Sequence, residues 1–415
     1  MLKTRIFLTK EKHMDVKIYP STISGSVEVE PFKAVCLRAL IASAFASAKT
    51  EIVMRGETED ILSTINCLNK LGANISGYMG KTIITPIDFD AEHYCEEGFD
   101  VGDSVATFRF LAPSISVLMG GGTFRGRAKL PKNIEDFLFS LSGVGFIGQK
   151  LPIKLNGKLK GGNITIKASA GSQAISGILM ALPLLKENSK LTVVGDIPSS
   201  YLVDVTLSVM KEFGVNVKRT NNTFSVSANE KYLSPESYAP EGDYSLAAYF
   251  LCAGEIGNGV TVEGLKKDTL QPEKNIYSLI EQCKTQSEIN LSGTADLIYP
   301  LTVLACYKKT DTVIKGAKRK TQKSIDKFTA FVSQLTKMGA QLTETEDGVI
   351  VKGITKLKGG VFVDSFGDAK IAMSLAIASC GAEEPTYLLS AESATKSYPT
   401  FFNSLVKLGA KCQAM

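Results

Sequence analysis

The sequence contains only two histidines, His13 and His93, and no tryptophan. So few histidines argue against a Ser–His–Asp catalytic set and against a multi-histidine metal site. The eight cysteines are scattered without a CxxC pair or a zinc spacing, which is typical of reduced thiols in the cytoplasm.

Long apolar runs are also missing. The least charged stretches, 110–124 and 168–185, are interrupted by Gly, Ser, Pro or Gln, and neither provides the roughly 20 apolar residues of a membrane span. The first residues, MLKTRIFLTKEK, lack the apolar segment of a signal peptide. We therefore expect a cytoplasmic protein without a membrane partner.

The chain has no strong excess of charge of either sign. Its 47 Lys and Arg residues against 42 Asp and Glu leave a formal net charge of +5. This excess is too small to require a nucleic-acid partner, and it suits a small anionic ligand. The 415 residues allow about two to three domains, and a hydrophobic content of 44% is typical of a soluble globular protein.

An amphipathic helix that ends in glycine, followed by a β-rich stretch, recurs along the chain. Glycine after the last helical turn is a common left-handed cap. Recurrence at roughly 70 residues indicates repeated units, with 276–286 as a degraded sixth copy. The five clear copies are 63–75, 135–146, 207–227, 331–353 and 401–413, and their glycines are Gly72, Gly145, Gly214, Gly339 and Gly409.

Alternating short strands and helices predict an α/β (α+β) fold. Six such units divide best into two domains of three units each. The loop 234–243 is polar and contains two prolines, so it is a natural boundary. We predict one domain over 32–239 and a second formed by 1–31 together with 240–415.

Isolated cations lie at the expected starts of helices. Lys33 and Arg38 fall in PFKAVCLRAL (31–40), although the N-terminal end of a helix favours anions over cations. Either they lie by chance on a solvated surface, or an anion such as phosphate binds between them and the exposed N–H groups. Arg109, in the apolar segment DVGDSVATFRFL, needs an anionic ligand or an internal salt bridge.

Polar residues precede two apolar helices. Ser172 and Gln173 begin the helix of ASAGSQAISGILMAL, and Asp296 precedes that of TADLIYPLTVLAC. Capping the helix N-terminus is an alternative explanation for Ser172 and Asp296, but it does not explain Gln173. Gln173 could instead bind a sugar-like hydroxyl.

Further cations occur in the second predicted domain. Lys370 and Lys396 each lie at a junction between a turn and a helix. The basic stretch KGAKRKTQKSIDKF (315–328) is a solvated charge run or a nucleic-acid patch, but it has no interleaved aromatics. Because cations come from both predicted domains, we expect an anionic substrate in a cleft between them.

Taken in order, these segments resemble the enolpyruvyl transferase family, and within it the EPSP synthases. ISGSVEVEPFKAVCLRALIASAFA is similar to the family's PGSKSxxxRALxxAALA run, and DSVATFRFL to its NSGTTMRLL segment. YLVDVTLSVMKEFGV follows PYIDxTLxxMxxFGV, and GSQAISGILMALPL resembles a helix that contains SSQ. EGDYSLAAYFLCAG, FGDAKIAM and TKSYPTFFNSLVKLG resemble EGDASSASYFLAA, DHRxAM and KSYPxFFxxLxxLG, so the resemblance covers nearly the whole chain from about residue 17.

The resemblance implies two domains, each of three βαβαββ units in an inside-out α/β barrel, that close on substrate. It implies a monomer that transfers the enolpyruvyl group of phosphoenolpyruvate to the 5-hydroxyl of shikimate 3-phosphate, in aromatic amino acid biosynthesis, without a metal or organic cofactor. One alternative is a paralogue that binds another phosphorylated metabolite with little or no activity. Another is the UDP-N-acetylglucosamine enolpyruvyl transferase branch.

The resemblance also implies roles for single residues. Lys33, Lys323 and Asp296 are the expected catalytic residues, with Asp296 handling the proton of the 5-hydroxyl. Arg109 would contact phosphoenolpyruvate, and Ser172 with Gln173 would contact shikimate 3-phosphate. The expected substrate-binding set is Lys33, Ala34, Arg38, Arg109, Lys132, Ser172, Gln173, Asp296, Lys323, Lys327, Lys370 and Lys396.

Several of these positions depart from the family pattern. The family's KESDR reads KSIDK here, so Ser324 replaces a glutamate expected in proton transfer. Loss of a general acid or base typically costs roughly 10²–10⁴-fold in rate. Lys327 and Lys370 replace arginines and lose the bidentate grip on carboxylate or phosphate. The other departures are Ala34 for serine, Ala369 for histidine, Val105–Ala106 for Gly-Thr, and Lys132 as the only cation where an Arg-Pro pair is absent.

Overall fold

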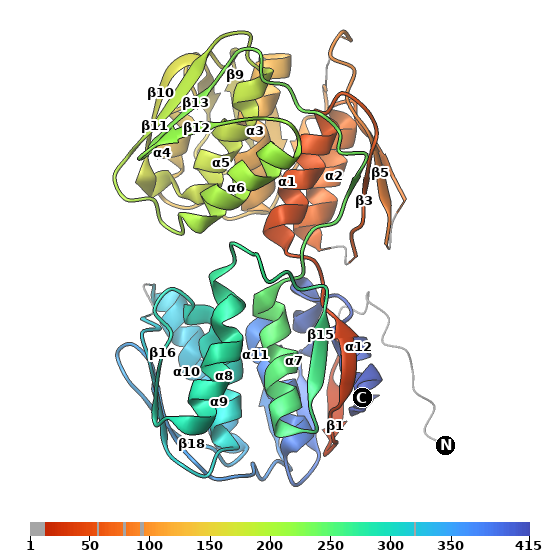
Figure 1. The fold of residues 1–415 in the computed structure, drawn as a ribbon, viewed down its shortest axis with the longest axis vertical. Helices are drawn as coiled ribbons and strands as arrows, with labels where there is room; N and C mark the ends of the chain where they lie inside the picture. Colours follow the sequence, from red (N-terminus) through yellow and green to blue (C-terminus); the bar gives the residue numbers. More distant parts are fainter. Residues whose placement is uncertain (1–12, 56–57, 78–79, 92–94, 319–320) are drawn as a thin grey trace. The chain divides into compact units, whose positions relative to one another are not determined.

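The computed structural model describes residues 13–55, 58–77, 80–91, 95–318 and 321–415, which divide into two compact units. The first is Pro31–Pro240, here the 31–240 unit. The second, here the 241–415 unit, joins Glu241–Met415 to the described residues before Pro31 (Figure 1). Each unit contains its own cluster of buried apolar side chains.

Two repeats of the 31–240 unit follow each other along the chain. In each, the first two strands pair in parallel across a helix, and the last strand pairs antiparallel with both the second and the third. One is β6 (Phe99–Asp100), α3 (Val105–Met119), β7 (Gly121–Arg125), α4 (Ile134–Leu138), β8 (Gly145–Ile147) and β9 (Ile153–Asn156). The next is β10 (Gly162–Lys167), α5 (Ser172–Ala181), β11 (Ser189–Val194), α6 (Tyr201–Glu212), β12 (Lys218–Thr220) and β13 (Thr223–Val226).

The third repeat of this unit is closed by strands from its two ends. β14 (Ser237–Tyr238), at the end of the unit, pairs in parallel with β3 (Thr50–Ile52) near its beginning. The remaining elements are α1 (Lys33–Ala44), α2 (Glu59–Lys70), β4 (Asn74–Ser76) and β5 (Thr82–Thr85), and the strand order is β14-β3-β5-β4.

The 241–415 unit has two four-stranded sheets among its described residues. The strands of the first sheet are β16 (Glu288–Asn290), β17 (Thr312–Lys315), β18 (Gln341–Glu344) and β19 (Val349–Lys352), and its connecting helices are α9 (Ile298–Cys306) and α10 (Gln322–Lys337). The strands of the second sheet are β20 (Phe362–Asp364), β21 (Thr386–Leu389) and β22 (Lys411–Ala414), and its helices are α11 (Ala369–Gly381) and α12 (Phe401–Lys407). Strand β1 (Val16–Tyr19) completes this sheet between β21 and β22.

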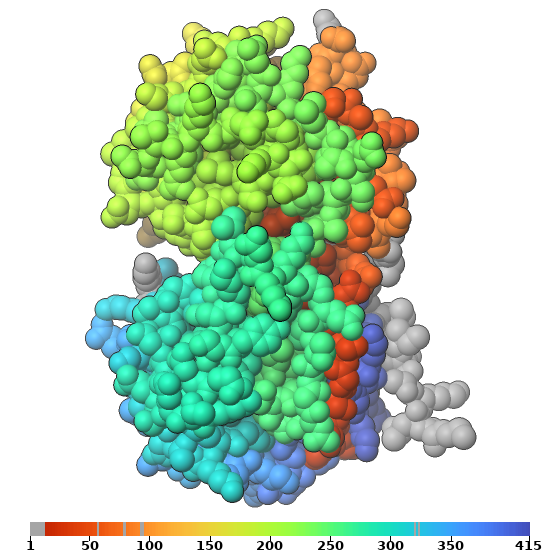
Figure 2. Space-filling model, in the orientation of Figure 1, coloured from red at the N-terminus to blue at the C-terminus, as the bar shows by residue number. Residues whose placement is uncertain are grey.

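The remaining repeat of this unit is shorter. β2 (Gly25–Glu28) pairs in parallel with β15 (Val260–Glu263), accompanied by α7 (Tyr244–Ile256) and α8 (Ile276–Thr285). Among the described residues, α8 is followed directly by β16, without an antiparallel pair. The space-filling view shows the red N-terminal residues between the green ones near β15 and the blue C-terminal ones (Figure 2).

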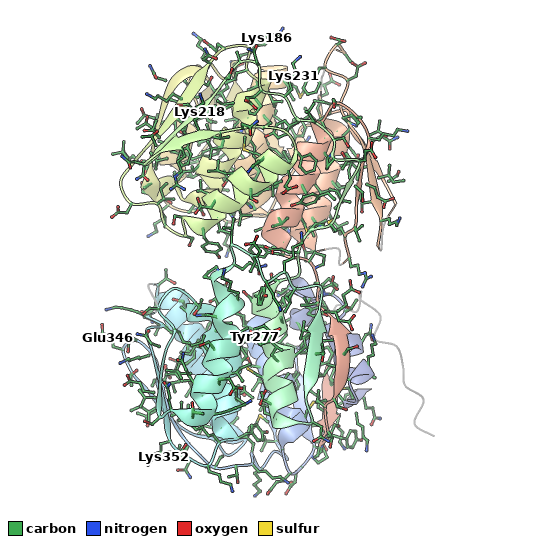
Figure 3. The ribbon with its side chains drawn as sticks, viewed as in Figure 1. Lys186, Lys218, Lys231, Tyr277, Glu346 and Lys352 are labelled. Atoms are coloured by element: carbon green, nitrogen blue, oxygen red, sulfur yellow. The ribbon has the colours of Figure 1, made fainter. Side chains whose placement is uncertain are left out.

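Helices form the interior of the 241–415 unit. α7, α9 and α11 contact one another, and α9 is buried at all nine of its residues. A helix that is apolar on every side must be surrounded by protein. The sheets lie outside, and strands such as β16 alternate buried and solvent-facing residues. Charged side chains such as Lys186, Lys218 and Glu346 point outward from their units (Figure 3).

Four of the five predicted capping glycines have the expected left-handed backbone. Gly72, Gly214, Gly339 and Gly409 have φ of 107°, 79°, 102° and 108°. Gly145 was wrongly predicted, because the helix expected over 135–146 ends at Leu138 and Gly145 begins strand β8. Gly143, with φ of 81°, makes the left-handed turn there instead.

Candidate active site

Lys33 and Ala34 begin helix α1. Phe32 is the N-cap residue, so Lys33 occupies the first helical position. Its ammonium lies 2.5 Å from Oδ2 of Asp60 at the start of α2, and the Lys33 side chain is 43% exposed. The pairing with Asp60, which sequence reasoning missed, explains how the cation is tolerated at a helix N-terminus. Ala34 is half-buried and offers only a methyl group to a ligand.

Arg38 is 2% exposed and joins three helices of the 31–240 unit. Its Nε donates to Oγ1 of Thr206 at 2.6 Å, and its two terminal nitrogens donate to Oγ of Ser176 and to the carbonyls of Ala34 and Leu202. The guanidinium also lies 4.8 Å from the ring centroid of Phe110. Burial lowers the pKa of Arg38 to about 9. These contacts position Arg38 within the unit, and its predicted contact with substrate stays a prediction.

Arg109 on α3 has no carboxylate partner among the described residues. One terminal nitrogen donates to Oε1 of Gln173 at 3.4 Å, and its buried Nε has no described partner. Burial lowers the pKa of this guanidinium. The described residues therefore provide no internal salt bridge for Arg109, the alternative considered from the sequence. A half-buried guanidinium whose buried Nε has no described partner favours binding an anion.

Gly177 brings α5 close enough to α3 for this contact. A Cβ at Gly177 would lie 2.0 Å from the carbonyl oxygen of Arg109, so only glycine fits there. Capping does not explain Ser172, because Gly171 is the N-cap residue of α5 and Ser172 is its first helical residue, 9% exposed. Lys132 is exposed, and no described residue forms an ion pair with it.

The 241–415 unit contains a cavity of about 350 Å³. The lining residues come from α9, α10 and α11, from the segments just before each of these helices and from the segment after β17, and they include most of the predicted site residues of this unit. They are Ala295, Asp296, Ile298, Tyr299, Ala317, Lys318, Thr321, Ser324, Lys327, Phe328, Asp368 and Lys370.

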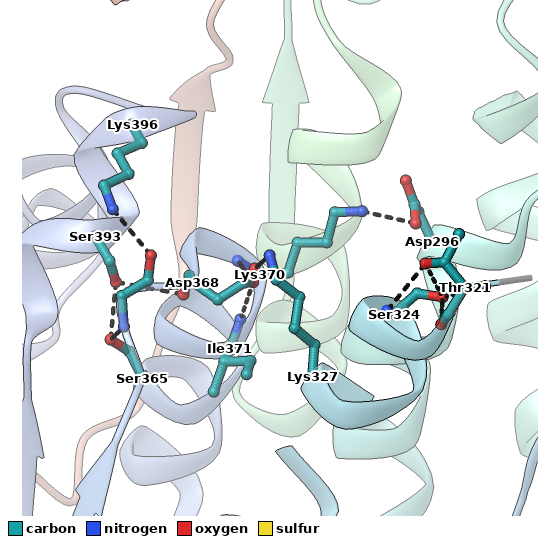
Figure 4. A network of polar contacts seen from close by, with 11 residues as sticks. Asp296, Thr321, Ser324, Lys327, Ser365, Asp368, Lys370, Ile371, Ser393 and Lys396 are labelled. Carbon is teal, nitrogen blue, oxygen red and sulfur yellow. Dashed lines mark hydrogen bonds and ion pairs between the residues drawn. The ribbon is translucent and has the colours of Figure 1, made fainter. Parts of the chain in front are cut away.

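Two lysines in the cavity are paired with two aspartates (Figure 4). Lys370 Nζ lies 2.6 Å from Oδ1 of Asp296, and both side chains are well exposed, at 41% and 62%. Lys327 pairs with Asp368, whose side chain is only 11% exposed. Asp368 is also the N-cap of α11 and accepts from the backbone N–H groups of Lys370 and Ile371.

The two pairs differ in how easily they can separate. Burial raises the pKa of Asp368, but the hydrogen bond and charge of Lys327, together with backbone donors, outweigh it and leave the pKa below its ordinary value. Asp368 is thus held as an anion by several donors. Asp296 lies second in the short helix Ala295–Leu297 and is not its N-cap, since that residue is Thr294. The exposed Asp296–Lys370 pair is therefore the one that a ligand can separate.

Ser324 belongs to the N-terminal cap of α10. Thr321 Oγ1 accepts from the Ser324 N–H, and Ser324 Oγ accepts from the Thr321 N–H, which forms a capping box. Ser324 is thus committed to helix structure as well as lining the cavity. The side chain of Lys323 lies outside the described part of the structure. Lys396 is exposed and donates to the carbonyl of Gly367 at 2.9 Å.

Glu273 is a titratable group that sequence reasoning missed. It lies in the short helix Pro272–Asn275 and is 8% exposed. Its pKa is raised to about 7, chiefly by burial and also by the charges of Asp243 and Asp296, although its own backbone N–H and Lys370 lower it. Only its neighbours in three dimensions distinguish it from an ordinary surface glutamate, so the sequence QPEKN carries no signal.

The family model for EPSP synthase (3-phosphoshikimate 1-carboxyvinyltransferase) matches residues 18–405. The chain belongs to the EPSP synthase family. A relative from Clostridium beijerinckii named 3-phosphoshikimate 1-carboxyvinyltransferase is 33% identical over 95% of this chain and 97% of its own. A relative from Clostridioides difficile with the same name is 32% identical over 95% of this chain and 98% of its own.

Solved structures agree in fold. An EPSP synthase from Acinetobacter baumannii superposes with a TM-score of 0.82 at 22% identity, covering 97% of this chain and all of that one. The enolpyruvyl transferase NikO from Streptomyces tendae superposes with a TM-score of 0.73 at 15% identity, covering 97% of this chain and 99% of its own. The predicted two-domain α/β fold of this family is confirmed.

Within an EPSP synthase, the structure explains what three departures from the family pattern change. Lys327 and Lys370 each place a single ammonium beside an aspartate, where an arginine would present a planar fork. Ser324 caps a helix and supplies no titratable group to the cavity. Among the described residues, no group of three or more His, Cys, Asp or Glu could hold a metal ion, and no helix is long and apolar enough to cross a membrane.

Proposed function

We propose that this chain transfers the enolpyruvyl group of phosphoenolpyruvate to the 5-hydroxyl of shikimate 3-phosphate, as a cytoplasmic monomer without a metal or organic cofactor. The observation that carries the proposal is the cavity in which Lys327 and Lys370 face Asp368 and Asp296. Two ammonium groups can hold an anion there, and a separable carboxylate can accept a proton. Family membership supplies the substrates.

In this reaction the 5-hydroxyl oxygen bonds to C2 of phosphoenolpyruvate, and the bond from C2 to the phosphate oxygen breaks. We assign removal of the hydroxyl proton to Asp296, because its carboxylate is 62% exposed and is released when Lys370 turns to the anionic substrate. The proton leaves on phosphate, so the reaction balances. On the basis of the family motif, Lys33 and Lys323 complete the catalytic set. Lys396 is assigned to substrate binding on the same basis.

We assign binding of the phosphorylated substrates to the 31–240 unit as well. The buried Nε of Arg109 lacks a described partner, and Gln173 lies beside it. An anion would supply the acceptor that this guanidinium lacks. Ser172, Ala34, Arg38 and Lys132 are included from the family motif.

Phosphate release from phosphoenolpyruvate and shikimate 3-phosphate tests the function. Ser324→Glu is the informative variant, because glutamate at the third helical position also forms a capping box and so preserves the start of α10. Turnover by the natural chain establishes the reaction. A faster Ser324→Glu variant would show that the missing carboxylate limits the rate.

A second candidate is a binding protein for another phosphorylated metabolite, which the use of Ser324 as a helix cap favours. No phosphate release by either protein, with anion binding retained, would support it. Calorimetry of shikimate 3-phosphate with Lys33→Ala gives an independent test, with the exposed Lys218→Ala as control. We expect binding to be lost only in Lys33→Ala, and unchanged affinity would refute the role of Lys33.

A further inference from the structure

The first turn of the five-residue helix α4 binds a neighbouring segment of the chain instead of capping its own helix. Asn133 is the N-cap residue of α4, but its side chain forms no cap hydrogen bond. Its Nδ2 donates instead to the carbonyl of Ser169, in the single helical turn Ala168–Ala170. Asp136, at the third helical position, accepts from Ser169 Oγ at 2.7 Å and from Lys167 Nζ at 3.0 Å. Side chains at these two positions typically bond to the free N–H groups of their own helix, so their use elsewhere calls for an explanation.

Ser169 is held at two points, its hydroxyl and its carbonyl, by Asp136 and Asn133, and we call this arrangement the Ser169 clamp. The hydrogen bonds from Ser169 and Lys167 lower the pKa of Asp136, so it accepts as an anion at neutral pH. A hydroxyl bonded to a carboxylate at this distance forms one of the stronger hydrogen bonds in proteins. The ion pair with Lys167 contributes little, because the Lys167 side chain is 71% exposed. The clamp therefore depends on Ser169.

The clamped segment, residues 168–171, leads directly into the surroundings of Arg109. Gly171, with φ of 89° and ψ of 161°, is the N-cap residue of α5, and Gln173 is the second helical residue. A Cβ at Gly171 would lie 3.6 Å from Nη1 of Arg109, and the same nitrogen donates to Oε1 of Gln173 at 3.4 Å. The guanidinium therefore lies against this segment, and a shift of the segment changes the surroundings of Arg109.

The clamp also joins two predicted substrate-binding regions that are separate in the sequence. Lys132 directly precedes Asn133, so the bond from Asn133 to Ser169 fixes the backbone of Lys132 beside segment 168–171. Both α4 and α5 contact the turn Ala168–Ala170. The buried Nε of Arg109 has no described partner and needs an acceptor. Holding the segment in place therefore prepares the surroundings of Arg109 for an anion.

We propose that Asn133 and Asp136 are positioning residues, which hold segment 168–171 so that Arg109 and Gln173 are kept in place for an anionic ligand. They act through Ser169 and not through contact with the ligand. The identity of the ligand as a substrate of enolpyruvyl transfer rests on the proposed function. The positioning of Arg109 for an anion does not, so inorganic phosphate serves as a second probe.

Steady-state kinetics of the full chain with varied shikimate 3-phosphate test the positioning role. Asp136→Ala should raise KM by roughly three- to tenfold and leave kcat nearly unchanged, because the clamp affects binding residues and not the proton transfer assigned to Asp296. Asp136→Asn should restore most of the affinity, since its amide oxygen can still accept from Ser169. Glu135→Ala is the matched control, because this neighbouring acid on α4 accepts from Gln149 Nε2 at 2.5 Å, and it should behave as the natural chain.

Calorimetry with inorganic phosphate shows whether the clamp acts through Ser169 and Arg109. Ser169→Ala removes the other end of the hydrogen bond and should weaken phosphate binding as much as Asp136→Ala does. The double variant should bind no more weakly than either single one, because all three lose the same bond. In an Arg109→Ala background, Asp136→Ala should have no further effect, which also separates this site from the cavity of the 241–415 unit.

Unchanged KM and phosphate affinity in Asp136→Ala would overturn the proposal, as would an equal loss in Glu135→Ala or in the Arg109→Ala background. Urea midpoints of Asp136→Ala and Glu135→Ala should be alike; a lower midpoint in Asp136→Ala with equal falls in kcat and affinity would show a merely structural role and also overturn it. Weaker phosphate binding in Asp136→Ala, without turnover by the natural chain, would refute only the proposed function. Turnover with unaltered binding in Asp136→Ala would refute only the clamp. No anion binding by the natural chain would overturn both.

Discussion

Replacement of the buried Arg38 should separate the effect of its charge from that of its hydrogen bonds. Burial lowers the pKa of Arg38 from 12.5 to about 9. A difference of this size corresponds to roughly 5 kcal/mol against the charged form. The hydrogen bonds to Thr206, Ser176, Ala34 and Leu202 and the ring of Phe110 offset this cost.

Arg38→Lys keeps the charge but has one ammonium in place of a planar fork. It cannot reach acceptors on three helices at once, and bonds to charged groups are worth about 1.5–3 kcal/mol each. We therefore expect the free energy of unfolding to fall by roughly 3–5 kcal/mol, the range seen when a buried charge loses its partners.

Arg38→Met removes the charge and leaves its acceptors with other partners. Thr206 Oγ1 still donates to the carbonyl of Leu202 at 2.9 Å and lies 2.7 Å from Oγ of Ser176. The loss should therefore be smaller, at about 1–2 kcal/mol, because apolar replacement of a buried charge is often nearly neutral.

Urea unfolding monitored by circular dichroism measures which of the two variants loses more free energy of unfolding. Arg219→Met is the matched control, because this arginine also lies near a ring, 5.1 Å from the centroid of Phe224, but its side chain is 32% exposed. It should change stability by less than about 1 kcal/mol. A loss in Arg38→Met equal to that in Arg38→Lys would refute the reasoning. A raised KM for shikimate 3-phosphate in a stable Arg38→Met would support the predicted substrate contact.

Three further changes test particular contacts. Glu273→Gln should leave the free energy of unfolding unchanged near pH 4, where the Glu273 carboxyl is neutral in both the folded and the unfolded chain. Near pH 8 it should raise the free energy of unfolding by up to roughly 3 kcal/mol, because the folded state then has to bury an ionised carboxylate whose pKa is raised to about 7. Equal urea midpoints of both proteins at pH 8 would contradict this. Gly177→Ala should cost about 1–3 kcal/mol in urea unfolding and weaken phosphate binding, because α5 must move away from Arg109; an unchanged phosphate affinity would argue against that coupling. Tyr232→Phe should cost about 1 kcal/mol in thermal unfolding through loss of its bond to the Met180 carbonyl, and no change would show that the bond contributes nothing net.

The repeated helix–glycine pattern was readable because it depends on local chemistry. Gly72, Gly214, Gly339 and Gly409 follow amphipathic helices and need a left-handed backbone whatever surrounds them. The pattern failed at Gly145, where α4 ends after five residues and the chain turns at Gly143. A short helix leaves too few residues for its end to be located from periodicity.

The strands that close each unit could not be assigned from the sequence. β14 pairs with β3, and β1 lies between β21 and β22. These pairings join residues that are far apart along the chain, and nothing in a strand of two to four residues identifies its distant partner. The predicted domain limits of 32–239 and 1–31 with 240–415 stay predictions.

The candidate site shows the same division. The sequence by itself determined which residues carry charge near the starts of helices, so Lys33, Arg109, Lys370 and Lys396 could be singled out and the family motif recognised. Only the tertiary structure decided how these charges are used: Arg38 is buried among neutral acceptors, whereas Lys370 faces the exposed Asp296. The physical reason is that a side chain's burial and partners depend on residues brought together by packing, and these set both its pKa and its freedom to bind a ligand.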